Sequence, residues 1–484
     1  MEFAFKQLNK PYIHGTEIPH MSKKSNIHFD VSERIVLLRV FDIVSVLALL
    51  YAVGLVFDFD YFKINSTHWF WSVVLALYLT IFATIFELYN LQKASRFEIV
   101  VQNVILTSSA TVLFYLLTPF YTPELPGNRL QIVYLYVSIN VALFIWRYAY
   151  ITLISTPRFF KRVLLVGNIN EVKEIVESLQ KVDPNYKVMG FIDTEPNNTQ
   201  AVKLFDLESC SIESVSDTIK AHRISEIVVA SLHPEAMTVY LYNQLILQLK
   251  NGVPIREYTQ VYEELTHRVP IQYMDRDFHR YFPFSRGNQN KLYLFFHRML
   301  DLLFSIIGLT FGSLISPFLL IGNLFANRGP FFYTQVRVGK NGKHFRMFKL
   351  RSMVIDAEKD GAQWATKKDI RVTRFGRFLR RSRFDEIPQF INVIKGEMSV
   401  IGPRPERPVF VEKLSKKITF YEVRHLVKPG VTGWAQVNAK YGMTEDDAMD
   451  KLQYDLYYIK QSNLSLDISI VIKTLSTIIF FRGQ

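Results

Sequence analysis

The sequence predicts a membrane protein with four N-terminal transmembrane helices, a Rossmann-like α/β module, and a re-entrant membrane helix that leads into a mainly α-helical C-terminal domain. Three observations support this prediction. Four long apolar stretches lie between residues 35 and 155, short apolar runs alternate with helical patterns from Lys161 onward, and a fifth apolar run precedes a basic C-terminal part. With 484 residues, of which 49% are hydrophobic, the chain is long enough for several domains and unusually apolar for a soluble protein.

Each of the four N-terminal stretches is close to the roughly 20 residues that cross a bilayer as a helix. They are Ile35–Phe57, Phe70–Phe86, Val100–Tyr121 and Leu130–Ile151. Arg39, Asp42 and Arg147 lie near the ends of their spans, where a long side chain reaches the interface or an acid stays hydrated, so they do not exclude the assignment. We therefore expect a transmembrane domain over residues 35–155.

The loops between these stretches indicate their orientation. Basic residues precede the first stretch, join the second to the third, and follow the fourth: Lys23, Lys24, Arg34, Lys93, Arg96, Arg158, Lys161 and Arg162. Cytoplasmic loops carry such an excess of positive charge, whereas the other two loops, FDFDYFKINSTH and TPELPGN, are poor in it. Residues 1–34 are too polar for a cleaved signal peptide and predict a cytoplasmic tail.

Residues 160–265 alternate short apolar runs with helical ones, from RVLLVG through YKVMGFID and ISEIVVAS to VPIREY. This alternation indicates βαβ units and a parallel sheet. The run RVLLVGNINEV is similar to the start of a dinucleotide-binding unit, but it has only Gly167 where G-x-G-x-x-G is expected. A nucleotide site and a structural or regulatory module both stay open, and Asp193 is either a ribose ligand or a turn residue. Residues 266–291 predict an interfacial linker.

The fifth apolar run, Leu302–Ile321, is interrupted by Ser316 and Pro317. Basic residues flank it on both sides: Arg280, Arg286, Lys291 and Arg298 before it, and Arg328, Arg337, Lys340 and Lys343 after it. Both ends should therefore lie on the same face of the membrane. We expect a re-entrant helix over residues 292–325 that breaks at Ser316-Pro317, because proline removes a backbone donor and clashes with the preceding turn. The alternative is a fifth spanning helix with a proline kink.

The most distinctive segment is RFDEIPQFINVIKGEMSVIGPRPE, which holds the adjacent carboxylates Asp385 and Glu386. Six arginines come just before the pair, mostly at three-residue steps, so most of them are expected to share one helix face: Arg371, Arg374, Arg377, Arg380, Arg381 and Arg383. Asp385 is expected as a helix N-cap, with Pro388 in the first turn and Gly396 as the stop. A cap and a solvated arginine stripe are the ordinary interpretation; together the residues suit a doubly charged phosphate ester and a divalent metal.

Further candidates for phosphate binding lie on both sides of the acid pair. Lys349 and Arg351 follow a predicted hairpin, and Arg404 is held between two prolines that stiffen its backbone and fix the reach of Glu406. The run KPGVTGWAQVN adds hydrogen-bonding groups, among them Thr432 and Gln436. Each of these pieces alone is an ordinary turn or core feature.

In this order and density, the blocks KLRSM, RFDEIPQ, KGEMSVIGPRPE, HLVKPGVTGWAQVN and YDLYYIK resemble the bacterial sugar transferase family, the polyprenyl-phosphate hexose-1-phosphate transferases. The resemblance runs from about Leu292 to the C-terminus and implies a phosphoglycosyl transferase catalytic domain over residues 326–484. The four spans and the α/β module resemble the long membrane form of that family. GPRPERPVFVE and YGMTEDDAMDKLQYDLYYIK resemble its exopolysaccharide-initiating branch.

The resemblance implies transfer of a hexose 1-phosphate from a UDP-sugar to undecaprenyl phosphate at the bacterial inner (cytoplasmic) membrane, with release of UMP, to initiate exopolysaccharide, capsule or O-antigen glycolipid synthesis. In family terms, Asp385 attacks the sugar-bearing phosphate to give an aspartyl phosphosugar, and Glu386 holds Mg²⁺. The residues expected to bind substrate are Lys349, Arg351, Arg383, Arg404, Glu406, Thr432 and Gln436.

The composition limits the alternatives. A net charge of +13 suits phosphorylated substrates, anionic membrane lipids or nucleic acid, but nucleic acid is not expected as a partner because the arginines lie beside paired acids and a membrane segment. The alternative function is a membrane-anchored phosphate- or nucleotide-binding regulator or scaffold of polysaccharide assembly without catalysis. The single cysteine, Cys210, excludes an internal disulfide and a Cys-based zinc site.

Two further properties follow less directly from the sequence. The closing stretch LSLDISIVIKTLSTIIF is apolar but carries Asp467 and Lys473, and it predicts an interfacial amphipathic helix. The identity of the hexose is not encoded in any separable motif. The oligomeric state is equally open, although the long N-terminal half is compatible with a homodimer.

Overall fold

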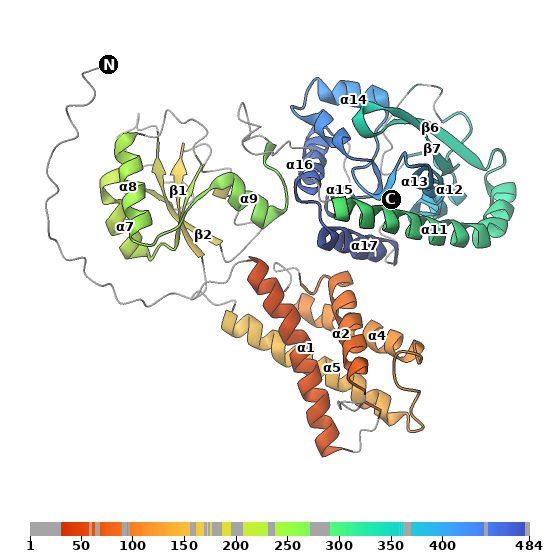
Figure 1. Cartoon of the computed structure of the whole chain (residues 1–484), viewed down its shortest axis with the longest axis horizontal. Coiled ribbons are helices and arrows are strands. Elements are labelled where there is room, and N and C mark those ends of the chain that lie inside the picture. Colours follow the sequence, from red (N-terminus) through yellow and green to blue (C-terminus); the bar gives the residue numbers. More distant parts are fainter. Residues whose placement is uncertain are drawn as a thin grey trace.

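The computed structural model describes residues 31–479, with the exception of 58–60, 63–67, 90–93, 95–96, 155–160, 169–171, 173–174, 177–185, 195–206, 231–237, 272–290, 358, 360, 362–368 and 440–443. Figure 1 shows a helical bundle, an α/β module, and a C-terminal domain along whose lower edge run helices α11 (Lys291–Ala326) and α17 (Leu464–Ile479). The predicted N-terminal tail and most of the predicted linker lie outside the described residues, as does most of the first predicted crossover helix.

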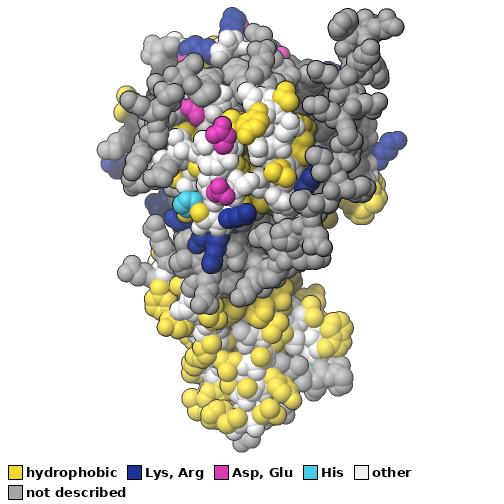
Figure 2. Space-filling view, turned by 90° about the vertical axis from the view of Figure 1, so that its left-hand side faces the viewer, with side chains coloured by type: hydrophobic (Ala, Val, Ile, Leu, Met, Phe, Trp, Pro, Cys, Tyr) yellow, Lys and Arg dark blue, Asp and Glu magenta, His cyan; other side chains and the backbone are white. Residues whose placement is uncertain are grey.

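The four predicted apolar stretches all form helices, which are α1 (Val31–Val56), α2 (Trp69–Ile85), α4 (Phe97–Leu117) and α5 (Leu130–Ala149), the last continued by a π-helical turn over Tyr150–Ile154. Within α1, α4 and α5 lie apolar segments of 19 to 24 residues, long enough to cross a bilayer. Helix α2 is apolar but has only 17 residues. Figure 2 shows hydrophobic side chains over the outer surface of this bundle, as expected for contact with lipid.

A buried ion pair joins the first and last helices of the bundle. Asp42 on α1 and Arg147 on α5 are completely buried and hydrogen-bonded to each other, and Arg147 also donates to the backbone oxygen of Leu88 at 3.1 Å. The sequence prediction that these two side chains reach the interface is therefore wrong. Pairing inside the bundle lets the two opposite charges compensate each other without water, as a hydrocarbon environment requires.

The middle part is a parallel α/β sheet, as predicted. Among the described residues the strands are β1 (Lys161–Gly167), β2 (Tyr186–Asp193), β3 (Glu208–Ser209), β4 (Glu226–Val229) and β5 (Ile255–Glu257), in the order β3-β2-β1-β4-β5. The described helices are η3 (Ile212–Ser214), α7 (Val215–His222), α8 (Val239–Lys250) and α9 (Tyr258–Thr266). Strand β1 is central because its run of Val and Leu residues is buried on both faces, as in other parallel sheets.

Helix α11 is the fourth apolar segment long enough to cross a membrane. It has 36 residues with Pro317 inside, so hydrogen bonding continues past the predicted break, although Figure 1 shows the helix changing direction in its C-terminal part. Many of its apolar side chains point outward, including Phe318 and Phe325. The helix thus exposes far more apolar surface than a helix packed in a soluble domain.

The C-terminal domain is mainly helical and contains two small sheets. The antiparallel hairpin consists of β6 (Phe332–Val338) and β7 (His344–Leu350), joined by the short helix η7 (Lys340–Gly342), and β8 (Ser399–Ile401) pairs in parallel with β9 (Gly430–Thr432). Its other elements are α12 (Arg374–Arg381), η8 (Phe384–Glu386), α13 (Gln389–Lys395), α14 (Pro408–Ser415), η9 (Tyr421–Leu426), α15 (Trp434–Asn438) and α16 (Glu445–Gln461).

Polar contacts dock the α/β module on the C-terminal domain through α9 and α16. The ammonium of Lys460 lies 2.7 and 2.9 Å from the two carboxylate oxygens of Glu263, and the hydroxyl of Tyr262 donates to Gln453 at 3.2 Å. Trp434 is buried and donates to the backbone oxygen of His267 at 3.1 Å, so this tryptophan belongs to the core. The two parts therefore share a built interface.

Candidate active site

The local backbone differs from the predicted helix start at the acid pair. Arg383 adopts a left-handed conformation with φ of 61°, and Asp385 and Glu386 then lie within the 3-10 helix η8. Pro388 is the N-cap of α13, so the prediction that Asp385 caps this helix is wrong, while Gly396 ends it as predicted with φ of 82°. This left-handed turn places Asp385 and Glu386 before α13 instead of within it, and the carboxylate of Glu386 contacts Lys349 of the hairpin.

Glu386 lies among three cations that come from separate elements. Its Oε1 is 3.1 Å from a guanidinium nitrogen of Arg404 and 3.4 Å from the ammonium of Lys349, and its Oε2 is 3.4 Å from Arg383. Lys349 lies on β7, Arg383 precedes η8, and Arg404 follows β8. The fold therefore brings Lys349 and Arg404, which are remote in the chain, to the local pair of Arg383 and Glu386.

Asp385 is buried like its neighbour but differs in its surroundings. The two side chains are 6% and 7% exposed, yet Oδ1 of Asp385 has no hydrogen-bond partner in the described part of the chain. Burial raises the pKa of Asp385 to about 6, the charge of Glu386 adds to this rise, and Lys349 opposes it. An unengaged buried carboxylate oxygen is costly for stability, which together with the raised pKa makes Asp385 a candidate functional residue.

The pKa values of both Glu386 and Lys349 are lowered, which favours the charged form of the acid and the neutral form of the amine. Burial alone raises the pKa of Glu386, but the charges of Arg404, Lys349 and Arg383 outweigh burial and hold that pKa well below its usual range. Burial lowers the pKa of the Lys349 ammonium to about 8, although Glu386 opposes this shift. Glu386 is therefore ionised at every physiological pH, whereas Asp385 and Lys349 titrate closer to neutrality.

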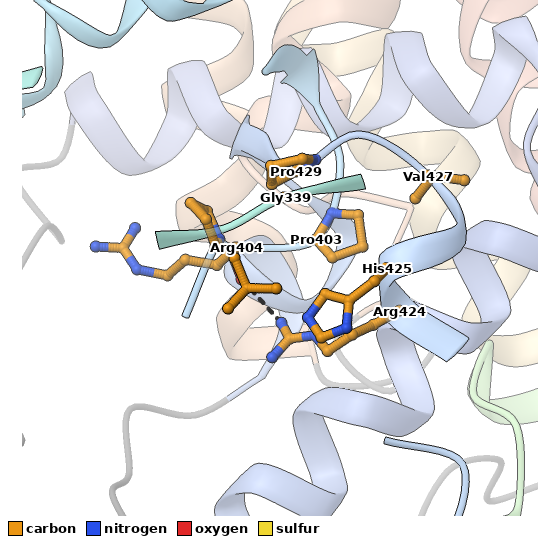
Figure 3. Close-up of a pocket in the computed structure, with 9 residues that line it drawn as sticks. Gly339, Pro403, Arg404, Arg424, His425, Val427 and Pro429 are labelled. Atoms are coloured by element: carbon orange, nitrogen blue, oxygen red, sulfur yellow. Dashed lines mark hydrogen bonds between the residues drawn. The ribbon is translucent and has the colours of Figure 1, made fainter. Parts of the chain in front are cut away.

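A second network fixes the segment that carries Arg404. Arg424 donates to the backbone oxygen of Arg404 at 2.9 Å and to the buried carboxylate of Asp455 at 2.8 Å. Figure 3 shows a small open pocket beside this segment, with the side chain of Arg404 pointing away from it and the ring of His425 facing into it. Burial lowers the pKa of His425 to about 4, so its imidazole is neutral at physiological pH.

Other predicted site residues lie elsewhere or make other contacts. Arg351 is buried and donates to the backbone oxygens of Pro330, Asn327 and Met353, so its guanidinium joins the hairpin to the end of α11. Glu406 faces Arg337 at 3.6 Å. The hydroxyl of Thr432 lies 2.7 Å from that of Thr474, and Gln436 donates to Val431. These contacts do not bring Arg351, Thr432 or Gln436 to the acid pair.

The arginines before the acid pair do not form one stripe on one helix. Helix α12 contains only Arg374, Arg377, Arg380 and Arg381. Arg371 is bound to Asp369, and Arg380 donates to the hydroxyl of Ser352 at 2.9 Å. Arg371 precedes α12 and Arg383 follows it in the left-handed turn, so these two lie outside the helix that carries the other four.

Sequence reasoning missed the polar residues that support the site. Asp301 and Arg298 on α11 and the pair of Arg424 and Asp455 are buried or half-buried, and they bind segments that follow the acids in the chain, from α13 to Arg404. Asp301 could have been found, because a carboxylate within an apolar run is costly unless it has a specific partner. Arg424 and Asp455 carry no comparable signal in the sequence.

The acid pair is the part of the site that suits a divalent cation. In the described segments no three His, Cys, Asp or Glu residues converge as a metal site. Mg²⁺ is commonly bound by one or two carboxylates, with substrate phosphates and water completing its octahedral shell. Asp385 and Glu386 supply carboxylates of this kind, although both oxygens of Glu386 face Lys349, Arg383 or Arg404 in this structure and Oδ1 of Asp385 is unengaged.

Comparison with known proteins agrees with this architecture. Residues 292–481 match the family model described as bacterial sugar transferase, and residues 84–245 match the model described as CoA-binding domain. The second match overlaps the parallel sheet and reaches into the bundle.

Individual relatives extend the first match. The chain is 41% identical over 232 residues to the UDP-N-acetylgalactosamine-undecaprenyl-phosphate N-acetylgalactosaminephosphotransferase of Aeromonas hydrophila, covering 47% of this chain and 52% of that protein. It is 42% identical over 190 residues to the UDP-glucose:undecaprenyl-phosphate glucose-1-phosphate transferase of Klebsiella pneumoniae, covering 38% and 40%. It thus spans about half or less of the length of these two relatives.

A shorter relative is matched almost throughout. The uncharacterized sugar transferase EpsL of Bacillus subtilis (strain 168) is 33% identical over 190 residues, which are 38% of this chain and 88% of that protein. The region matched by the family model contains the acid pair, its three cations and helix α11 from its second residue onward. The chain therefore belongs to the bacterial sugar transferase family.

Proposed function

We propose that this protein transfers a hexose 1-phosphate from a UDP-sugar to undecaprenyl phosphate through an aspartyl phosphosugar on Asp385, releasing UMP. The observation that carries the proposal is that the two adjacent acids have different hydrogen-bonding and ion-pair partners. Glu386 is held by three cations, whereas Asp385 keeps a buried oxygen without a partner in the described structure. A free carboxylate oxygen beside cations that bind phosphate is suited to attack phosphorus.

In the first step, a carboxylate oxygen of Asp385 attacks the phosphorus that bears the sugar. A bond forms between this oxygen and phosphorus, and the bond from phosphorus to the bridging oxygen of the diphosphate breaks. UMP leaves with that electron pair. The sugar 1-phosphate then remains on Asp385 as a mixed acyl phosphate, which conserves the reactivity of the diphosphate.

In the second step, a phosphate oxygen of undecaprenyl phosphate attacks the same phosphorus. The bond between phosphorus and the Asp385 oxygen breaks, the carboxylate is regenerated, and the product is a lipid diphosphate linked to the sugar. Two successive displacements let one small site serve two bulky substrates in turn. No proton acceptor is needed, because both attacking oxygens are already ionised.

Lys349, Arg383 and Arg404 are placed to neutralise the phosphates during both steps. Their positive charges lie within 3.4 Å of Glu386, and a diphosphate that enters beside the acid pair would meet the same three groups. Glu386, next to Asp385, would hold Mg²⁺, which supplies charge neutralisation on the diphosphate when bound.

The proposed reaction needs a site at the membrane surface, and α11 supports such a placement as a re-entrant helix. An uninterrupted straight helix of 36 residues would extend over roughly 54 Å. Yet Arg298 near its start donates to Val393, and Asn327 just after its end donates to Arg351, so both ends contact the same domain. Gly312 in its middle packs against Ile387, the residue after Glu386.

This arrangement would place the acid pair directly beneath the segment that enters the bilayer. A lipid phosphate and a soluble nucleotide sugar would then meet there, with the α/β module and the C-terminal domain on the cytoplasmic side. The names of the Aeromonas and Klebsiella relatives support undecaprenyl phosphate and a UDP-sugar as substrates, but these names differ in the sugar. Initiation of exopolysaccharide, capsule or O-antigen synthesis is the corresponding cellular role.

A second candidate function is a membrane-anchored scaffold of polysaccharide assembly that binds phosphates without chemistry. The degenerate glycine pattern at Gly167 in the α/β module is compatible with such a role. A scaffold would not require an unengaged carboxylate at Asp385.

The test is a UMP-release panel on the full-length protein in nanodiscs. UDP-glucose, UDP-galactose and their N-acetylated relatives are each incubated with undecaprenyl phosphate and Mg²⁺. UMP release that depends on one sugar, together with a phosphosugar adduct on Asp385 found by mass spectrometry when the lipid is omitted, supports the proposal. Absence of UMP with every sugar favours the scaffold, and UMP release without an adduct contradicts the covalent route.

A further inference from the structure

One turn of the membrane helix α11 contacts two segments of the C-terminal domain: α13, which follows the acid pair, and β8, which precedes Arg404. Arg298 and Asp301 lie three residues apart on this helix, with their charged groups 3.9 Å from each other. Asp301 is 3% exposed within an otherwise apolar run, a position where an acid is retained only for a specific partner.

Arg298 holds the helix that follows the acid pair. Its two terminal nitrogens donate to the backbone oxygens of Val393 and Ile394, at 2.8 and 3.0 Å. These oxygens belong to the last turn of α13, where a positive charge is favourable, and that of Val393 also accepts a hydrogen bond from the Gly396 N–H. Arg298 therefore fixes the far end of the short helix that begins directly after Glu386.

Asp301 holds the strand that precedes Arg404. One of its carboxylate oxygens accepts hydrogen bonds from the backbone nitrogen of Val400, at 2.7 Å, and from the hydroxyl of Ser399, at 2.8 Å. Both residues belong to β8, and Arg404 follows this strand after Gly402 and Pro403. A carboxylate that accepts a backbone N–H and a hydroxyl in a buried setting fixes that strand firmly.

We propose that Arg298 and Asp301 are positioning residues that set the contact between Arg404 and Glu386. This inference rests on the proposed function and adds a mechanical link from the membrane helix to the site. The acid pair is connected to α11 through α13 and Arg298, and Arg404 is connected to the same turn through β8 and Asp301. Insertion of α11 in the bilayer therefore determines the geometry at which the cation faces the acids.

The protein offers a matched control for this turn. Asp467 on α17 is also buried, at 1% exposed, and it contacts the same helix α11 by accepting a hydrogen bond from Tyr293 at 2.9 Å. It accepts a second hydrogen bond from Tyr458 at 3.1 Å. No hydrogen bond or ion pair among the described residues joins Asp467 to β8 or α13. Loss of Asp467 removes an equally buried acid that reaches Asp301 only through His297, which lies 3.7 Å from Asp467 and 3.8 Å from Asp301, and it leaves the hydrogen bonds from β8 to Asp301 in place.

The experiment compares Asp301→Ala, Asp301→Asn and Asp467→Ala in nanodiscs by steady-state UMP release. Asp301→Ala is expected to lower kcat by about thirtyfold or more while the KM for the UDP-sugar changes by less than about threefold, since misplacement of a group that acts in the transition state affects kcat. Asp301→Asn keeps an acceptor oxygen and should retain more activity. Asp467→Ala should stay within about threefold of the wild type.

A double-mutant cycle tests whether Asp301 acts through Arg404. In an Arg404→Ala background, adding Asp301→Ala should lower kcat by less than about threefold, because the side chain that Asp301 positions is already absent. Fully multiplicative losses, or equal losses for Asp301→Ala and Asp467→Ala, would overturn the inference. If Asp301→Ala does not accumulate, Ser399→Ala removes one of the two donors to Asp301 and should shift kcat in the same direction by a smaller factor.

Hydrogen exchange provides a readout that does not depend on turnover. Segment 399–406 should exchange faster in Asp301→Ala than in the wild type and should be unchanged in Asp467→Ala. Unchanged exchange in both variants would refute the positioning role. A wild-type protein that shows no UMP release with any sugar would instead refute the proposed function, so the two failures are distinguishable.

Discussion

The guanidinium of Arg404 lies 3.1 Å from a carboxylate oxygen of Glu386, whereas the neighbouring Asp385 keeps a buried oxygen with no partner in the described part of the chain. Two adjacent acids thus occupy different electrostatic environments. Environments that separate the pKa values of two carboxyl groups also assign them different roles. Glu386 is suited to hold charge in place, and Asp385 is suited to react.

Replacement of Asp385 by Asn should abolish turnover. The amide has the shape of the carboxylate but is not a nucleophile toward phosphorus, so UMP release should fall by at least about a thousandfold. Membrane fractionation should show unchanged insertion, which serves as the control. Residual UMP release within tenfold of the wild type would argue against an aspartyl intermediate.

The same substitution should stabilise the protein at neutral pH. Burial raises the pKa of Asp385 from 3.8 to about 6, so across this range the folded protein binds the proton more tightly than the unfolded chain does. The free energy of unfolding therefore falls as pH rises through this window, and the full loss is reached above about pH 6. At pH 7.5, Asp385→Asn should raise the midpoint of thermal unfolding by about 3 °C or more, with a smaller gain near pH 4.

Asp369 provides the control of opposite sign for this measurement. Its hydrogen bonds with Arg371 lower the pKa of Asp369, so its contribution to stability is present above the unfolded value and is lost as pH falls. Asp369→Asn should therefore lower the unfolding midpoint at pH 7.5. A decrease for both variants would show that burial of Asp385 carries no electrostatic cost.

Replacement of Glu386 by Gln should also remove activity, by at least about a hundredfold. This change would remove the negative charge that Lys349, Arg383 and Arg404 surround. It would also remove the proposed metal ligand. Chelation of divalent cations should inactivate the wild type, and added Mg²⁺ should restore it. Turnover that persists in excess chelator would contradict the role of the metal.

The pH dependence of kcat/KM should be bell-shaped. The acidic limb should lie near pH 6, where Asp385 becomes ionised, and the alkaline limb near pH 8, where Lys349 loses its charge. Lys349→Arg tests the second assignment because a guanidinium stays charged at higher pH. The alkaline limb of this variant should move upward by at least about one pH unit, and an unmoved limb would assign it to another group.

Gly376 is predicted to be intolerant of any side chain. A Cβ at this position in α12 would lie 1.8 Å from the backbone oxygen of Ser352, which cannot move aside as a flexible side chain would. Gly376→Ala should therefore destabilise the protein by about 1–3 kcal/mol or more and displace α12 from the site. Gly127→Ala, which faces open space, is the control. Equal unfolding midpoints for the two variants would show that α12 can shift freely.

Much of the fold could be predicted because it depends on local patterns. Apolar length marked α1, α2, α4 and α5, and the alternation of β and helical runs marked the parallel sheet around β1. The local pattern was misleading at Asp385, where the left-handed turn at Arg383 replaces a simple helix cap. It was also misleading at Asp42 and Arg147, whose positions near the span ends gave no sign that they pair inside the bundle.

Part of the candidate site could be predicted in the same way. The sequence marked Asp385, Glu386, Lys349, Arg383 and Arg404 as residues of the types that bind phosphate or metal, and these five converge. It also marked Arg351 by its type, but that side chain is occupied by backbone oxygens at the end of α11. Residue type indicates what a side chain can bind, whereas the positions of the surrounding carbonyl groups decide what it does bind.

The sequence by itself determined the kinds of segment, the residues able to carry the chemistry, and the membership in a family. Only the tertiary structure decided that Asp385 and Glu386 are unequal and that one turn of a membrane helix holds the two segments that follow them, α13 and β8. The physical reason is that charge interactions and hydrogen bonds depend on distances across the fold. Such distances arise from packing between elements remote in the chain, which no local pattern encodes.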